Sequence, residues 1–104
     1  MRLPIVAANC SHVYHQYVIR APHRNALQAY LRDHGVPSEI YYPAPLHLQP
    51  AFHGLGYKLG DLPQSEAASR EVLALPIFPE MTDEQQRLVI DLMAAFYCNP
   101  DRHR

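Results

Sequence analysis

The chain has 104 residues, a formal net charge of −1 at pH 7 and a hydrophobic content of 48 %. This length predicts one globular domain. The near-zero charge argues against nucleic acid or an anionic membrane as a partner, and no apolar run reaches the roughly 20 residues that span a bilayer. Cys10 and Cys98 have no C-x-x-C spacing, so we expect reduced thiols and a cytoplasmic protein.

The first third of the chain predicts a strand followed by a helix. Residues 1–11 have no clear period and are interpreted as a lead-in segment. Residues 12–20 alternate and are rich in aromatic and β-branched side chains, which is typical of a strand. Pro22 suits the first turn of a helix, and an apolar stripe of helical period runs from there toward Gly35, a natural residue just after a helix end.

A stiff, proline-rich run occupies residues 42–52. Three of its residues precede a proline, and because proline favours extended geometry in the residue before it, the run cannot be regular helix or central strand. His47 is the only histidine of the run. Stiff loops present polar contacts to ligands, so His47 is a candidate binding residue. A buried linker whose histidine is merely satisfied by its neighbours is an equal alternative.

Short elements are expected around this run. A second strand is predicted over 39–42 and a single helical turn over 48–52. Glycines mark a flexible loop over 54–60, and Asp61 with a glutamine three residues later predicts the N-terminal cap of a helix that ends near Val72.

The last third predicts a short extended segment and a long amphipathic helix. Large apolar residues alternate over 73–77 and run into Pro76 and Pro79, as in a short third strand or extended segment. Thr82 and Gln85 form a capping pattern, and an apolar stripe with a period near 3.6 predicts a helix over 83–97. These elements together indicate an α+β domain, a mainly antiparallel sheet of about three strands with three helices packed on it.

No pattern of residues points to a metal or to a catalytic nucleophile. His12 and His15 are three apart on a predicted strand, so their side chains should point to opposite faces. His47 and His53 are separated by a proline turn, and no carboxylate has a spacing typical of a zinc site. No serine or cysteine lies in a nucleophile motif. We therefore assign no metal site and no catalytic residue.

Several motifs follow one another in the order found in a known domain. They are the segment 12–20, Tyr42-Pro43, Pro45-Leu46-His47, Gly60-Asp61-Leu62-Pro63 with Glu66, 73–79 and 82–86. Over about residues 3–97 this succession resembles the C-terminal small domain of the DegT/DnrJ/EryC1/StrS family of sugar aminotransferases. On this basis 1–11 is a lead-in, 12–97 the small domain and 98–104 a tail.

The resemblance implies a pyridoxal-phosphate enzyme of the aspartate-aminotransferase fold, which aminates a nucleotide-linked keto-deoxysugar, as in polysaccharide biosynthesis. Such enzymes are usually homodimers, and a large N-terminal domain carries their Schiff-base lysine. The only lysine here, Lys58, lies in the glycine-rich loop and does not match that position. Because pyridoxal chemistry requires an amine, we expect a fragment of such an enzyme that binds no cofactor and is inactive by itself.

The same resemblance implies three substrate-binding residues. His47 matches a histidine that approaches the sugar-nucleotide side of the active site, and Tyr42 is its stiff neighbour. Arg20 ends the first strand, where a guanidinium can bind a carboxylate or phosphate, although a structural salt bridge is the more common use. Asp61 and Glu66 are interpreted as a helix cap and a structural partner.

Two interpretations of the whole chain stay open. As part of an aminotransferase, it should expose an apolar face to a large pyridoxal-phosphate-binding domain, with His12 and His15 orienting the first strand against that domain. As a stand-alone, non-catalytic module for dimerisation or nucleotide-sugar binding, it should have a closed or self-paired surface.

Overall fold

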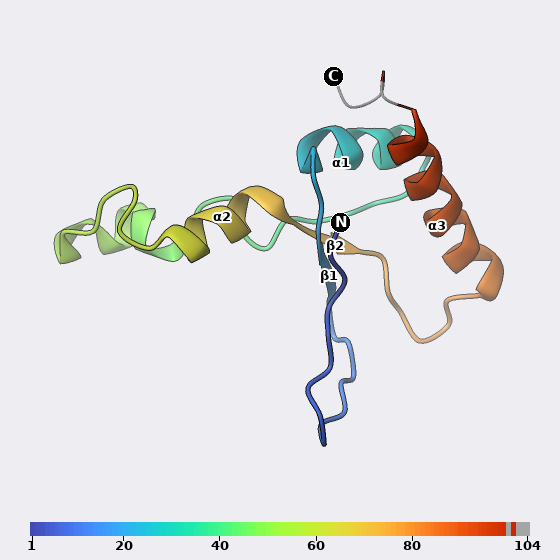
Figure 1. The fold of residues 1–104 in the computed structure, drawn as a ribbon, viewed down its shortest axis with the longest axis horizontal. Coiled ribbons are helices and arrows are strands. Elements are labelled where there is room, and N and C mark those ends of the chain that lie inside the picture. The colour runs from blue at the N-terminus through green and yellow to red at the C-terminus, as the bar shows by residue number, and fades with distance from the viewer. Residues whose placement is uncertain (100, 102–104) are drawn as a thin grey trace.

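A small antiparallel sheet lies at the centre of the computed structural model, which describes residues 1–99 and 101 (Figure 1). Strands β1 (Tyr17–Arg20) and β2 (Val72–Leu75) pair so that the first residue of β1 faces the last residue of β2. An isolated bridge flanks each strand, Arg2 with Arg20 and Glu39 with Ala74. The second strand predicted over 39–42 is reduced to the second of these bridges, whereas the third one predicted over 73–77 forms β2.

β1 is shorter than the sequence predicts because the backbone leaves the strand conformation before residue 17. Tyr14 has φ of 50°, in the left-handed region, where the pleat of a strand cannot continue. Residues 3–16 instead form a loop that protrudes from the sheet, with a turn at Asn9, whose φ is 62° (Figure 1). The alternation of residues 12–20 therefore describes a strand only over its last four residues.

Two helices supply most of the core. α1 (Arg24–Asp33) packs against α3 (Asp83–Cys98) and against β2. α1 begins after Pro22, because His23 has a left-handed backbone with φ of 54°, and it ends at a turn where Gly35 has φ of 79°. The buried apolar side chains form one cluster: Ile19, Ala21, Leu27, Leu31, Val36, Leu73, Val89, Met93 and Phe96. We call β1, β2, α1 and α3 the body.

The capping pattern predicted for the last helix is confirmed. Thr82 Oγ1 accepts a hydrogen bond from the Gln85 amide at 3.1 Å, and Gln85 Oε1 accepts one from the Thr82 amide at 2.9 Å. Two of the four amides that a helix start leaves unpaired, those of Thr82 and Gln85, thereby have hydrogen-bond partners. α3 ends at Cys98, one residue beyond the predicted end and inside the predicted tail 98–104, of which residues 100 and 102–104 lie outside the described residues.

A second region projects from the body, and we call residues 41–62 the arm. It holds two short 3₁₀ helices, η1 (Leu46–Leu48) and η2 (Pro50–Leu55), where the sequence predicts a single turn. η1 packs against η2, and α2 (Pro63–Glu71) carries the chain back from the arm to β2 (Figure 1). The proline-rich run therefore ends up away from the main core.

The N-terminus of α2 differs from the prediction. Its cap residue is Leu62, which has no capping side chain, and Asp61 instead accepts a hydrogen bond from the Lys58 amide at 2.9 Å. Pro63 occupies the first position of the helix, where its missing N–H costs nothing. The Leu62 amide donates to Glu66 Oε2 at 3.2 Å, so Glu66, within the helix, accepts from an amide at the helix start in place of the predicted cap Asp61.

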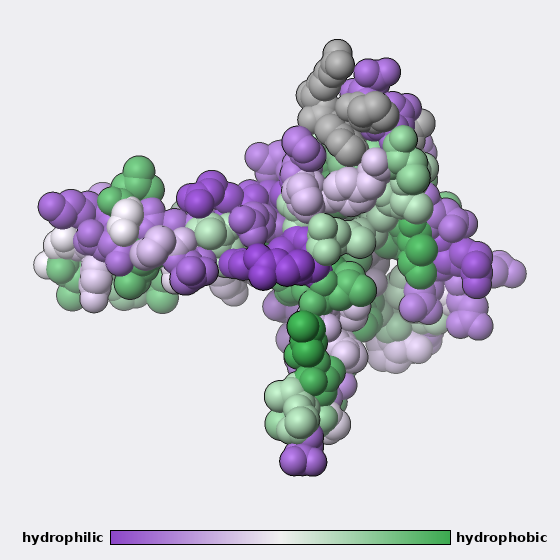
Figure 2. All heavy atoms as spheres, in the orientation of Figure 1, coloured by the Kyte–Doolittle hydropathy of each residue, from purple (hydrophilic) through white to green (hydrophobic). Residues whose placement is uncertain are grey.

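Apolar side chains remain exposed at both projections. Figure 2 shows them gathered on the protruding N-terminal loop, where Ile5 and Val13 are almost fully exposed. The arm also exposes Leu46, Leu55 and Leu59. No described helix combines the length and the apolar character that crossing a membrane requires.

Candidate functional site

The proline-rich run places His47 in η1 and buries it, with 6 % of its surface exposed. Its Nε2 atom lies 3.3 Å from Glu66 Oε2, on α2. An ionised carboxylate can only accept hydrogen bonds, so Nε2 carries the hydrogen at this contact. The side chain that the sequence singled out is thus held by the residue interpreted as a structural partner.

Glu66 is the centre of this contact. Its carboxylate also accepts hydrogen bonds from the Gly60 amide, at 2.8 and 3.0 Å, and from the Leu62 amide at 3.2 Å. The Gly60 amide holds the pKa of the Glu66 carboxyl below its ordinary value; the Leu62 amide and His47 add to this effect, whereas burial opposes it. Glu66 is therefore ionised at neutral pH.

The second ring nitrogen of His47 has no hydrogen-bond partner among the described residues, although Nδ1 is buried. The Tyr57 ring stands edge-on to the imidazole, with 6.0 Å between the ring centres. Both ring nitrogens are therefore withheld from solvent in this conformation. A ligand can therefore contact the His47 ring nitrogens only after the side chains around the ring move.

Tyr42 has the opposite environment. Two-thirds of its surface is exposed (66 %), and its ring packs edge-on against Tyr41 at a centre distance of 5.7 Å. Most of the Tyr42 side chain is therefore accessible to a group outside the described residues. Tyr42 stands where the chain passes from the body into the arm, at the start of the stiff run.

Arg20 lies in the body at the end of β1. Its Nε atom is 3.7 Å from Glu71 Oε2, a partly exposed ion pair with the last residue of α2. α2 thus pairs with Arg20 at one end and with His47 near the other, so these two predicted contacts belong to different regions of the molecule. The pair to Glu71 is the structural salt bridge that the sequence left as an alternative for Arg20.

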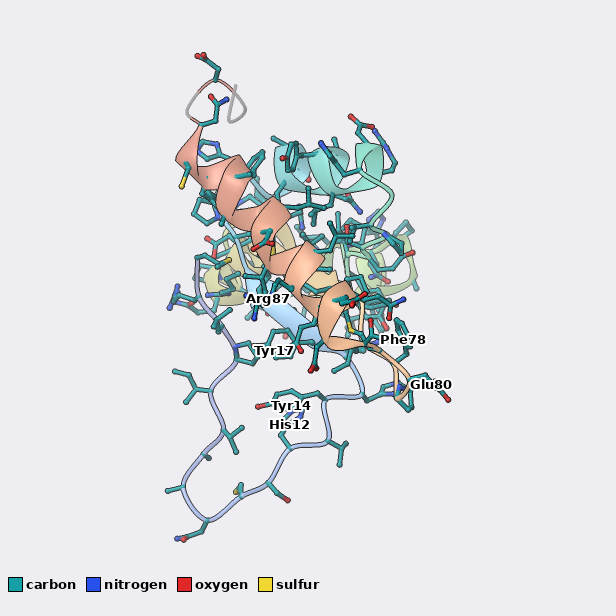
Figure 3. The ribbon with its side chains drawn as sticks, turned by 90° about the vertical axis from the view of Figure 1, so that its right-hand side faces the viewer. His12, Tyr14, Tyr17, Phe78, Glu80 and Arg87 are labelled. Atoms are coloured by element: carbon teal, nitrogen blue, oxygen red, sulfur yellow. The ribbon has the colours of Figure 1, made fainter. Side chains whose placement is uncertain are left out.

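An aromatic stack near β1 carries no signal in the sequence. The His12 and Tyr14 rings are stacked with centres 4.4 Å apart, and the Tyr14 and Tyr17 rings are 5.3 Å apart (Figure 3). His12 Nδ1 accepts a hydrogen bond from the Tyr14 amide at 2.8 Å. The expectation that His12 and His15 point to opposite faces of a strand was wrong, since both precede β1 and the left-handed Tyr14 turns the chain between them.

Two shallow pockets lie on the body. One, of about 210 Å³, is lined by residues that include His15, Ser38, Glu39 and Tyr41, and the buried Ser38 hydroxyl has no partner among the described residues. The other, of about 280 Å³, lies between residues 2–5 and the edge of β1. Among residues 1–99 and 101, no cluster of three potential ligands is arranged to hold a metal ion.

The surroundings of Lys58 do not fit pyridoxal phosphate. Lys58 is exposed in the turn after η2, where its amide donates to Asp61, and it lines neither pocket. An aldimine-forming lysine needs an enclosed site that also holds the cofactor ring. No such enclosure surrounds Lys58.

A family model described as the DegT/DnrJ/EryC1/StrS aminotransferase family matches residues 2–94. A pleiotropic regulatory protein of Geobacillus stearothermophilus is 56 % identical over 86 residues, which are 83 % of this chain and 23 % of that protein. A dTDP-3-amino-3,4,6-trideoxy-alpha-D-glucose transaminase of Streptomyces venezuelae is 37 % identical over 89 residues, 86 % of this chain and 24 % of that protein. The chain thus spans about a quarter of the length of these curated relatives.

Solved structures give the same result. DesV of S. venezuelae, in complex with a ketimine intermediate, is 35 % identical with a TM-score of 0.87, over 91 % of this chain and 26 % of that one. A DegT DnrJ EryC1 StrS aminotransferase from Brucella abortus is 34 % identical with a TM-score of 0.84, over 94 % of this chain and 26 % of that one. The α+β fold predicted from the sequence is confirmed, with two strands in place of about three.

Proposed function

Because this chain belongs to the DegT/DnrJ/EryC1/StrS aminotransferase family, we propose that it forms the C-terminal small domain of an enzyme that aminates a nucleotide-linked keto-deoxysugar. The observation that carries the proposal is the match of residues 2–94 to that family. Several relatives are named as transaminases or aminotransferases of dTDP- or UDP-linked sugars. A cytoplasmic location is part of the same proposal.

We propose two further partners for this chain in the complete enzyme. One is a large domain that holds pyridoxal phosphate, and the other is the second subunit of a homodimer. The exposed apolar side chains of the arm and of the N-terminal loop support this proposal, because a single domain rarely leaves such groups uncovered. The alternative of a stand-alone module predicts a closed or self-paired surface, so the oligomeric state of the purified chain separates the two proposals. We retain residues 12–97 as the domain proper.

The proposal gives the three predicted site residues different parts. Tyr42 contacts the nucleotide sugar with its exposed ring, and His47, which is buried, contributes from the same stiff run. Arg20 either binds substrate or holds Glu71 alone. In the complete enzyme, His47→Ala should reduce turnover of the nucleotide sugar more than it weakens cofactor binding. Equal loss of both would count against the assignment.

The proposal also implies that this chain alone forms no specific bond with the cofactor. The test is to mix the 104-residue chain with pyridoxal phosphate, reduce with borohydride and locate the label by mass spectrometry. We expect only sparse labelling, unsaturated with cofactor concentration and divided between Lys58 and the N-terminal amine. Lys58→Arg is the control. Saturable, stoichiometric labelling of Lys58 would overturn this part of the proposal.

The coding sequence before the first codon gives the most direct test of the whole. An open frame that encodes a large domain with a pyridoxal-type lysine, and a purified product that aminates a dTDP- or UDP-linked ketosugar, are the expected results. A 104-residue product that forms a defined oligomer and binds a nucleotide sugar by itself would instead support the stand-alone module.

A further inference from the structure

We infer that Glu66 is a positioning residue, which fixes the Nε2–H form of His47 and fastens both ends of residues 47–62 to α2. The contacts of one carboxylate carry this inference. The consequence for substrate binding rests on the proposed function; the structural part does not.

The first step is the placement of the donors. His47 lies at the start of the segment, in η1, whereas Gly60 and Leu62 lie at its end, just before α2. All three donate to the Glu66 carboxylate, at distances between 2.8 and 3.3 Å. One side chain therefore closes the loop that η2 and the glycine-rich turn form between these points. Within the described residues 41–62 the only helices are the short η1 and η2, so this side chain holds the loop where no strand pairing does.

The second step is the chemistry of the ring. Gly60 and Leu62 place two amide dipoles on Glu66, which favour its ionised form, and an ionised carboxylate offers no hydrogen to share. His47 must then donate from Nε2. Nδ1 is buried without a partner, so the tautomer that leaves Nδ1 without a hydrogen avoids an unpaired buried donor. The Nε2–H tautomer satisfies both conditions.

The third step concerns what lies around the contact. Tyr57 closes one side of the imidazole edge-on, and it presents no charge to the ring. The carboxylate of the arm itself, Asp61, is engaged by the Lys58 amide and is exposed. Glu66 is therefore the group that determines the state of His47, and Asp61 provides a matched control on the same segment.

The consequence for the proposed enzyme follows from the position of the arm. The stiff run from Tyr42 to His47 can present a fixed surface to a nucleotide sugar only while its far end is held. Releasing Glu66 should loosen that surface without altering the body. The effect should appear in the KM for the nucleotide sugar more than in kcat.

The experiment combines two measurements on the 104-residue chain. Nitrogen-15 NMR of the imidazole reports which nitrogen is protonated, and amide hydrogen exchange reports the protection of Gly60 and Leu62. We expect the Nε2–H tautomer in the parent chain and in Asp61→Asn. Glu66→Gln should shift the ring away from that tautomer and speed exchange of the two amides by about tenfold or more.

Two substitutions of His47 separate its hydrogen bond from its ring. Glutamine places an amide N–H where Nε2 stands, whereas asparagine is one bond shorter. His47→Gln should therefore keep the protection of Gly60 and Leu62, and His47→Asn should lose it. Slow exchange of the Leu73 amide in β2 verifies that each variant is folded.

The inference is overturned if the parent ring is the Nδ1–H tautomer, or if Glu66→Gln leaves both amides as protected as Asp61→Asn does. These outcomes need neither cofactor nor sugar. In the complete enzyme, Glu66→Gln should raise the KM for the nucleotide sugar several-fold, with Asp61→Asn close to the parent. A parent enzyme without aminotransferase activity would remove the proposed function and leave the NMR and exchange results to decide the positioning role.

Discussion

The body and the arm use the same residue types in different ways. Leu27, in α1, is fully buried against the core of the body, whereas Leu59, in the arm, is 77 % exposed. The most enclosed side chain of the arm is instead the polar His47, which is bound to the buried Glu66 of α2. The body is thus held by apolar burial, which is strong and has little directionality, and the arm by a few directional hydrogen bonds. A region held in this way keeps its apolar side chains available for another surface.

The largest expected effect compares one substitution in the two regions. Leu27→Ala removes a fully buried side chain and should lower the free energy of unfolding by about 2–5 kcal/mol. Leu59→Ala should change it by less than about 0.5 kcal/mol, because its side chain is already in water. Urea denaturation followed by circular dichroism measures both. Similar losses for the two variants would end the distinction between body and arm.

The next effect concerns a hydrogen bond within the body. Thr82→Ala removes the oxygen that accepts the Gln85 amide and should destabilise the chain by about 1 kcal/mol. Thr82→Ser keeps that oxygen and should lose much less. The same denaturation measurement applies. A serine variant as unstable as the alanine variant would show that the methyl group, and not the cap, matters.

A smaller effect is expected where α2 meets the body. The partly exposed pair of Arg20 and Glu71 should contribute about 0.2–1 kcal/mol of coupling energy, because solvent screens it. A double-mutant cycle of Arg20→Gln and Glu71→Gln measures this coupling. A coupling near the upper end supports a structural role for Arg20. No coupling, together with impaired substrate binding by Arg20→Gln in the complete enzyme, would support its role as a ligand contact.

The smallest effect on the whole chain is the response of the arm to acid. The pKa of Glu66 is lower in the folded chain than its ordinary value of 4.5, so its ionised form stabilises the fold above that pH. This stabilisation is lost as pH falls below 4.5 toward the folded-state pKa. Hydrogen exchange should show that the Gly60 amide loses protection before the Ile19 amide does. In Glu66→Gln the Gly60 amide should already be unprotected at neutral pH, and a retained acid transition there would contradict this explanation.

Local chemistry determined several features of this protein before any tertiary contact. The helix over 83–97 follows from its cap and its apolar stripe, both of which act within a few residues. Gly35 ends α1 because the turn there needs a positive φ. The ordered motifs from residue 12 to residue 86 were enough to indicate the family, because a resemblance depends on residue types and their order and needs no knowledge of contacts.

Tertiary structure decided the rest, because it depends on residues far apart in the chain. Whether His47 faces a ligand or a neighbour was open in the sequence, and Glu66, nineteen positions away, binds its ring. The strand predicted over 12–20 was cut short by the left-handed Tyr14, which alternation of side chains cannot reveal. The sheet kept only two strands because residues 39–42 meet β2 through a single bridge. Periodicity specifies which face a segment can bury, and only the assembled chain specifies what lies against that face.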